Sequence, residues 1–139
     1  MSTRDIKRYN LLTAQAATGE SEQIFVGDFR NAVLALGTAS SANLTIKVKG
    51  GIVMQSAEEL PVDPDLSAAR SASNIWDYVQ VVDLQDGSGI AGDTGIAWAG
   101  TDDYRLVEIN VNSVDYISVE VTARSAGSVS AFVTLTNNQ

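Results

Sequence analysis

The sequence contains no cysteine and no histidine. The first absence excludes disulfides, thiolate nucleophiles and metal sites built on cysteine. The second removes the commonest general base, the commonest metal ligand and every Ser-His or Cys-His nucleophile pair. Enzymes can use carboxylates, lysine or tyrosine instead, but no set of such residues stands out along the 139 residues. The sequence therefore predicts a protein that is not an enzyme and that uses no cofactor.

Basic residues are also scarce, because nine Lys and Arg stand against seventeen Asp and Glu and give a net charge of -8. A chain of this charge is repelled by phosphate backbones, so we expect no nucleic-acid partner. No apolar run is long enough to span a membrane, and the N-terminus lacks the apolar stretch of a secretory signal. We therefore expect no membrane partner and synthesis in a cytoplasm.

What the sequence does contain is alternation of apolar and polar residues with a period of two, which is typical of half-buried antiparallel strands. The clearest segments are residues 43–50, 104–112, 115–123 and 128–136, and residues 22–28, 75–84 and 95–100 give weaker strand signals. Closely spaced strands separated by Gly, Asn, Asp and Ser favour a sandwich over a βαβ fold. We predict an all-β, single-domain protein with a jelly-roll-like antiparallel β-sandwich.

Two stretches interrupt this rhythm and are predicted to contact partners. Residues 1–21 form either an N-terminal arm or a first strand, and residues 55–74 form a long loop within a sandwich domain that spans residues 22–139. Long loops inside compact domains often bind a partner, and Trp and Tyr are enriched at interface hot spots. The candidate interface residues are Arg4, Lys7, Arg8, Tyr9, Leu60, Pro61, Pro64, Trp76, Tyr78 and Trp98.

The stretch GSGIAG, residues 87–92, matches the glycine pattern G-x-G-x-x-G of dinucleotide-binding proteins. That motif requires a helix directly after the glycines to hold the pyrophosphate. Here turn residues and a strand pattern follow, and nearby aspartates have the wrong charge for a phosphate. We therefore interpret GSGIAG as a turn between strands.

The same loop raises the possibility of a calcium site, because Asp83, Asp86 and Asp93 offer hard oxygen ligands. Their spacing fits neither an EF-hand nor a repeated calcium-binding nonapeptide. Since Asp and Gly are also the residues that tight turns prefer, we expect no bound metal. The acidic pairs Glu58-Glu59 and Asp102-Asp103 are expected to be solvated surface charge rather than a glycosidase pair.

Residues 71–133 resemble the capsid cement or decoration proteins of tailed bacteriophages. The resemblance is carried by the segments WDYVQVVDL, DGSGIAGDTG, GTDDYR and VTARSAGSVS, and the stretch that contains them covers about half of the chain. It implies a β-rich protein that forms homo-oligomers on the exterior of the virion capsid and stabilises it by bridging major capsid protein subunits. A self-complementary dimer is favoured over a trimer, because dimers are the commonest small homo-oligomers.

Two other functions stay open at this stage. Trp76, Tyr78, Trp98 and Tyr104 could form a stacking platform in a carbohydrate-binding module. The chain could also be a tail or tail-spike component of the virion.

Overall fold

The computed structural model describes residues 6–53 and 74–137, which form strands and turns with no helix among them. Within these residues, therefore, no helix is long and apolar enough to cross a membrane. All strand pairings are antiparallel, so the all-β prediction is confirmed. The strands are β1 (Ile6–Gln15), β2 (Gly19–Glu20), β3 (Ile24–Phe25), β4 (Asn31–Val53), β5 (Asn74–Tyr78), β6 (Val81–Asp83), β7 (Gly89–Ile90), β8 (Ile96–Ala99), β9 (Tyr104–Ile109) and β10 (Tyr116–Thr136).

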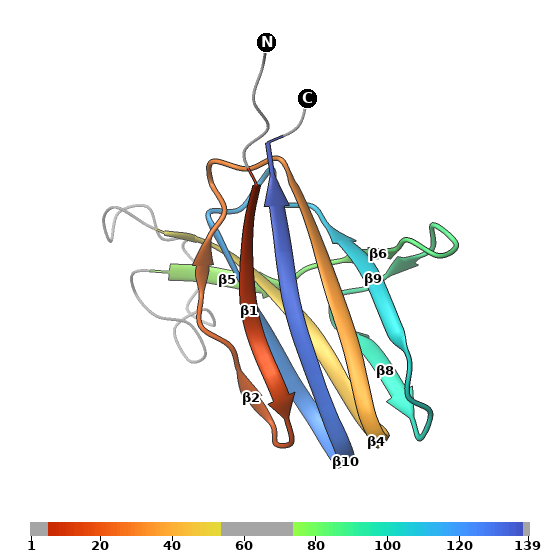
Figure 1. Cartoon of the computed structure of the whole chain (residues 1–139). Coiled ribbons are helices and arrows are strands. Elements are labelled where there is room, and N and C mark those ends of the chain that lie inside the picture. The colour runs from red at the N-terminus through yellow and green to blue at the C-terminus, as the bar shows by residue number, and fades with distance from the viewer. Residues whose placement is uncertain (1–5, 54–73, 138–139) are drawn as a thin grey trace.

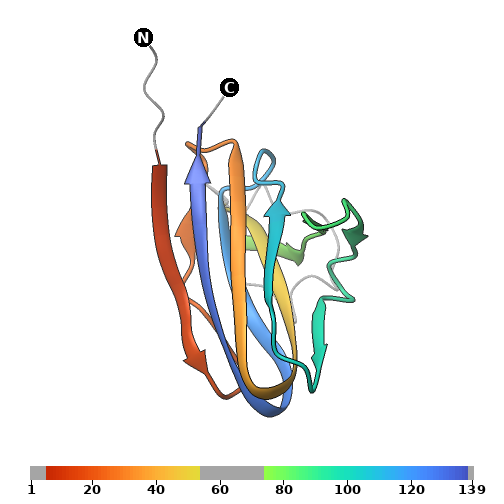
Figure 2. The ribbon, with the colours of Figure 1, turned by 45° about the vertical axis from the view of Figure 1, so that its right-hand side comes forward.

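Two long strands, β4 and β10, pair with each other along nearly their whole length and organise the fold (Figure 1). Both strands bend sharply, so the ribbon they form folds back on itself into two layers (Figure 2). The first layer contains β1, the second half of β10, the first half of β4, β9 and β6. The second layer contains β2 and β3, the first half of β10, the second half of β4, and β5 with β8. This wrapping of a bent antiparallel ribbon is the predicted jelly-roll sandwich.

The bend of β4 is fixed by local polar contacts. Ser40 and Ser41 have φ values of 64° and 54°. The Asp102 carboxylate accepts hydrogen bonds from the backbone N–H groups of Ser41 and Ala42, both at 2.9 Å. On β10, Gly127 has a φ of 77°, and a Cβ there would collide with the backbone of Ala42. A glycine is needed at this point because the two bends touch.

The core lies between the layers and uses one face of each strand. The inward positions predicted from the alternation are confirmed, and each such side chain stabilises the fold by about 1.5–3 kcal/mol when fully buried. These buried residues are Leu44, Ile46, Val48, Val107, Ile109, Ile117, Val119, Val121, Val129, Ala131, Val133 and Leu135.

Residues 75–84 differ from the sequence prediction, which treated them as one strand. They form two strands, because the chain leaves β5 in the second layer and enters β6 in the first. Val79 lies at this crossing and packs against the core. Residues 75–84 therefore carry apolar side chains on both faces because the chain changes layer within this stretch. In contrast, residues 115–123 and 128–136, expected as separate strands, belong to the single strand β10.

The N-terminal region forms an edge of the first layer. Residues 6–15 pair with β10 as β1, which corresponds to the first-strand alternative rather than to an arm. Arg4 lies outside the described residues, as does the predicted loop at 55–74 apart from its last residue. The interface candidates Leu60, Pro61 and Pro64 belong to that loop, so they also lie outside the described residues.

Candidate functional site: the two outer faces of the sandwich

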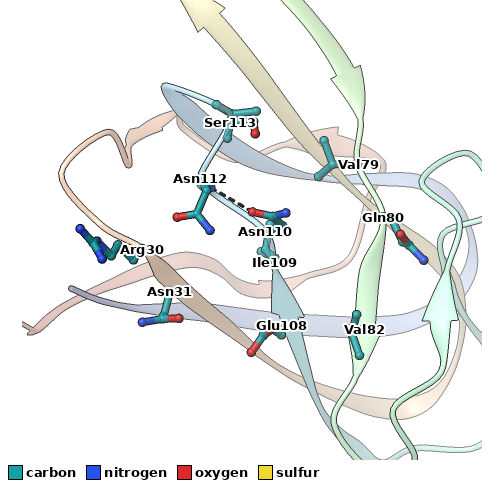
Figure 3. Close-up of a pocket in the computed structure, with 11 residues that line it drawn as sticks. Arg30, Asn31, Val79, Gln80, Val82, Glu108, Ile109, Asn110, Asn112 and Ser113 are labelled. Carbon is teal, nitrogen blue, oxygen red and sulfur yellow. Dashed lines mark hydrogen bonds between the residues drawn. The ribbon is translucent and has the colours of Figure 1, made fainter. Parts of the chain in front are cut away.

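A polar pocket of about 550 Å³ opens where β4 begins and β9 ends (Figure 3). Arg30 and Asn31 line one side, and Asn110 and Asn112 line another, with the Asn112 N–H donating to the Asn110 side chain at 3.0 Å. Glu108 is the single carboxylate in the lining. This set of groups suits hydrogen bonding to a polar surface better than acid–base chemistry, which needs matched acidic and basic groups.

The outer face of the second layer carries a cluster that joins four strands, and we call it the Lys49 cluster. Cross-strand register places Lys49 between Ser118 and Tyr78, and Glu120 between Glu20 and Lys47. Residues directly opposite each other on neighbouring strands share a face of the sheet. The members of the Lys49 cluster are Glu20, Lys47, Lys49, Trp76, Tyr78, Ser118 and Glu120.

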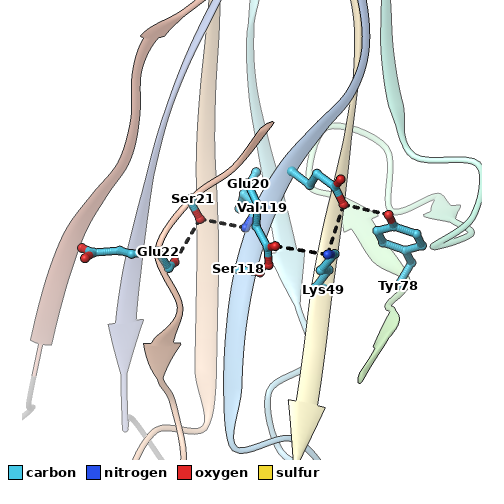
Figure 4. A network of polar contacts seen from close by, with 8 residues as sticks. Glu20, Ser21, Glu22, Lys49, Tyr78, Ser118 and Val119 are labelled. Atoms are coloured by element: carbon cyan, nitrogen blue, oxygen red, sulfur yellow. Dashed lines mark hydrogen bonds and ion pairs between the residues drawn. The ribbon is translucent and has the colours of Figure 1, made fainter. Parts of the chain in front are cut away.

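Lys49 is the centre of this cluster (Figure 4). Its Nζ lies 3.2 Å from Glu20 Oε2 and 3.4 Å from Glu120 Oε1, and only 14% of its side chain is exposed. The Ser118 hydroxyl donates to Glu20 Oε1 at 2.6 Å. Glu20 and Glu120 face each other on paired strands and would repel, so the ammonium between them removes an unfavourable contact. The two carboxylates and the lysine therefore satisfy one another within the chain.

The two aromatic rings of the cluster are held in fixed positions. Lys49 Nζ lies 4.2 Å from the centre of the Trp76 ring, and Lys47 Nζ lies 5.0 Å from that of Tyr78. The two rings meet edge to face with their centres 5.3 Å apart. The Tyr78 hydroxyl donates to Glu120 Oε1 at 2.7 Å. Burial, and then this hydrogen bond to a carboxylate, raise the pKa of Tyr78 to about 12. The cluster thus presents half-buried Trp76 and Tyr78 as preorganised contact residues.

The outer face of the first layer is different, because apolar side chains gather there without covering residues. Phe132 lies opposite Ala35, and Ala35 lies opposite Leu106. The backbone N–H of Leu84 donates to the Leu106 carbonyl at 3.0 Å, so Leu84 lies beside Leu106 in the same row across the strands. Phe132, Leu106 and Leu84 are 46%, 53% and 45% exposed. We call Phe132, Ala35, Leu106 and Leu84 the apolar row.

The loop that follows β6 is a structured turn that includes the first two residues of GSGIAG, whereas Gly89 and Ile90 of that stretch form β7 and pair with β6. The carboxylate of Asp83 accepts from the Gln85 N–H and that of Asp86 from the Ser88 N–H, both at 2.9 Å. Gly87 has a φ of 76°, which favours glycine. The calcium candidates Asp83, Asp86 and Asp93 do not converge, since the described part of the chain contains no group of three acidic residues able to hold a metal.

The remaining predicted contact residues are distributed over the molecule. Lys7 and Arg8 are exposed on β1, whereas Tyr9 is half-buried and packs against the core. Trp98 must be corrected: it is 3% exposed and its indole N–H donates to Asp103 at 2.5 Å, so it is a core residue. The alternation of Ile96 and Trp98 with Ala97 and Ala99 was the sequence signal for this burial. Asp103 also pairs with Arg105 at 3.5 Å.

Sequence reasoning missed two features of these faces. The ion pairs of Lys49 join strands that are far apart in the chain, and the apolar row uses residues from the polar side of each strand pattern. A large apolar residue at such a position, as at Leu106 and Phe132, was the available signal.

No protein-family model and no curated protein matches this sequence. Among solved structures, the SPBc2 prophage-derived protein YomS matches with a TM-score of 0.68 and 12% identity over 98% of this chain and 96% of its own. The PBSX exported protein XepA matches with a TM-score of 0.65 and 11% identity over 98% of this chain and 39% of its own. The fold is shared with a prophage-derived protein. This chain spans nearly all of YomS and less than half of XepA, and at such identities the likeness concerns the fold alone.

Proposed function

We propose that this chain is a non-enzymatic structural protein of a tailed-phage virion, which binds the exterior of the assembled capsid and stabilises it by bridging major capsid protein subunits. The resemblance of residues 71–133 to cement proteins supports the virion assignment. The jelly-roll fold supports it further, because a prophage-derived protein shares this fold over 98% of the chain.

The observation that carries the binding proposal is the Lys49 cluster. Trp76 and Tyr78 belong to the residue types that dominate interface hot spots, and their rings are already fixed in the free chain. Preorganised side chains lose little conformational entropy when a partner binds. We assign this face to the contact with the capsid.

The same cluster favours a protein partner over a sugar. Carbohydrate binding combines a free aromatic face with unoccupied hydrogen-bonding groups beside it. Here Lys49 lies against Trp76, and both carboxylates of the cluster are engaged by Lys49, Tyr78 and Ser118. A capsid surface needs only the edges and exposed portions of the two rings.

The mechanism of stabilisation is mass action. A protein that binds the assembled shell, and not dissociated subunits, shifts the equilibrium toward the shell. Many copies on a symmetric surface, each self-associated, would add avidity. The site of action is then the capsid exterior, after synthesis in the host cytoplasm.

Co-sedimentation with capsids that lack this protein tests the proposal. Wild-type protein should sediment with assembled capsids and not with unassembled major capsid protein. Trp76→Ala should weaken binding about 30-fold, as expected for a hot-spot residue, and Trp76→Phe should weaken it less. Arg124→Ala, at the bend of β10 away from the cluster, is the matched control and should bind as wild type does.

Equal binding by Trp76→Ala and wild type would remove the capsid contact from this face. Failure of the wild-type protein to sediment with any capsid preparation would overturn the function itself. A glycan array run in parallel should show no binding, and sugar-dependent retention lost in Trp76→Ala would support a carbohydrate-binding module instead.

A further inference from the structure

The outer face of the first layer carries charged residues that are not part of the proposed contact with the capsid. Arg8 lies on β1, opposite Thr134 of β10, and Glu108 lies on β9, opposite Val33 of β4. One cross-strand series therefore runs Arg8, Thr134, Val33, Glu108, with a cation at one end and an anion at the other. Neighbouring strands are about 4.8 Å apart, so the two charges are separated by roughly 14 Å.

Neither charge is neutralised within the described part of the chain, where the ion pairs involve other residues. Both Arg8 and Glu108 are exposed. Directly beside this series lies the apolar row, with three large side chains that are close to half exposed. A face that carries an apolar row beside a series with opposite charges at its two ends is complementary to a copy of itself.

We propose that a second copy of this chain packs against this face, related by a two-fold axis that runs parallel to the strands between β4 and β10. Such an axis places each strand of one copy over the strand that is symmetric to it across the axis. β1 then faces β9 of the second copy, and β10 faces β4. The rotation brings Arg8 of each copy over Glu108 of the other, so two identical ion pairs form at the two ends of the series.

The same operation matches the shapes of the apolar row. Phe132 and Ala35 lie directly opposite each other within one sheet, so the axis places the Phe132 ring of one copy over Ala35 of the other. A large side chain over a small one permits close packing of two sheets at the usual separation of about 10 Å. Leu106 of one copy lies over Asn10 of the other, because Asn10 is opposite Phe132 on β1. Burying Phe132 supplies the attraction, and the two ion pairs fix the orientation. This face, opposite to the Lys49 cluster, is therefore a dimer interface whose existence does not depend on the capsid proposal.

Charge exchange tests this arrangement with the full-length protein. Sedimentation equilibrium over a range of concentrations should show that the wild type forms a dimer. Arg8→Glu and Glu108→Arg should each raise the dimer dissociation constant by about tenfold or more, because each places like charges opposite one another twice. An equimolar mixture of these two variants should dimerise about as well as wild type, since both contacts in the heterodimer join opposite charges.

Lys7→Glu is the matched control, because it makes the same change of net charge one residue away on the other side of β1, and it should dimerise as wild type does. Phe132→Lys tests the apolar row separately and should give a monomer with an unchanged circular dichroism spectrum.

A wild-type chain that stays monomeric at every concentration would overturn the proposal, as would a dimer or trimer that is insensitive to Phe132→Lys. Failure of the mixture to recover association would overturn the two-fold orientation. Loss of capsid binding in Arg8→Glu, with a monomeric wild type, would show that this face contacts the capsid instead.

Discussion

The two outer faces of the sandwich use the same kinds of residues in opposite ways. In the Lys49 cluster, charges of both signs pair within one chain and hold two aromatic rings in place. On the opposite face, Arg8 and Glu108 lie at the two ends of one cross-strand series, and the apolar row beside it is uncovered. The comparison shows that interactions completed within the chain hold the contact residues of the Lys49 cluster in place, whereas the groups left uncovered on the opposite face are available for association with a second copy.

The largest expected effect comes from removing the central charge of the Lys49 cluster. Lys49→Ala leaves Glu20 and Glu120 facing each other without a cation, and we expect it to destabilise the fold by about 2 kcal/mol. Arg105→Ala, which removes the more exposed ion pair with Asp103, should cost less than about 1 kcal/mol. Urea unfolding of both variants measures these free energies. Equal losses would show that the cluster is no more integral to the fold than an ordinary surface pair.

A pair of glycines provides a more local test. A Cβ on Gly51 would meet the ring of Tyr116, and a Cβ on Gly37 would meet the ring of Tyr104 at 2.9 Å. Tyr116 is 6% exposed and cannot move aside, whereas Tyr104 is 92% exposed and can. We expect Gly51→Ala to destabilise the fold by about 1–3 kcal/mol and Gly37→Ala by less than about 0.5 kcal/mol, as measured by thermal unfolding. A larger loss of stability in Gly37→Ala than in Gly51→Ala would contradict the view that Tyr116 is held in place and Tyr104 is free to move.

The smallest effect is a dependence on alkaline pH that is confined to the cluster. The pKa of Tyr78 rises from its usual 10 to about 12 in the folded chain, so the unfolded chain loses this proton at lower pH. The contribution of Tyr78 to stability is then complete below pH 10 and decreases as the pH rises toward 12. The difference in unfolding free energy between wild type and Tyr78→Phe should shrink over this interval. A difference that stays constant would show that the Tyr78 phenol is not held by Glu120.

The features that the sequence predicted are those set by neighbouring residues along the chain. Alternation identified the inward positions of β9 and β10, and the Asp and Gly residues identified the turn between β6 and β7. Trp98 was misplaced although the alternation of Ile96 and Trp98 with two alanines indicated its burial. The Lys49 cluster and the apolar row depend on strand register, which joins Lys49 to Glu20 and Ala35 to Phe132 across long stretches of chain. Register follows from the packing of the whole sandwich, so alternation alone could not predict either face.

A cryo-electron microscopy reconstruction of virions that carry this protein tests the central claim most directly. We predict density for the jelly roll on the exterior of the capsid, with Trp76 and Tyr78 against two neighbouring capsid subunits and the apolar row against a second copy. Density restricted to the tail, or a capsid exterior without this protein, would contradict the account.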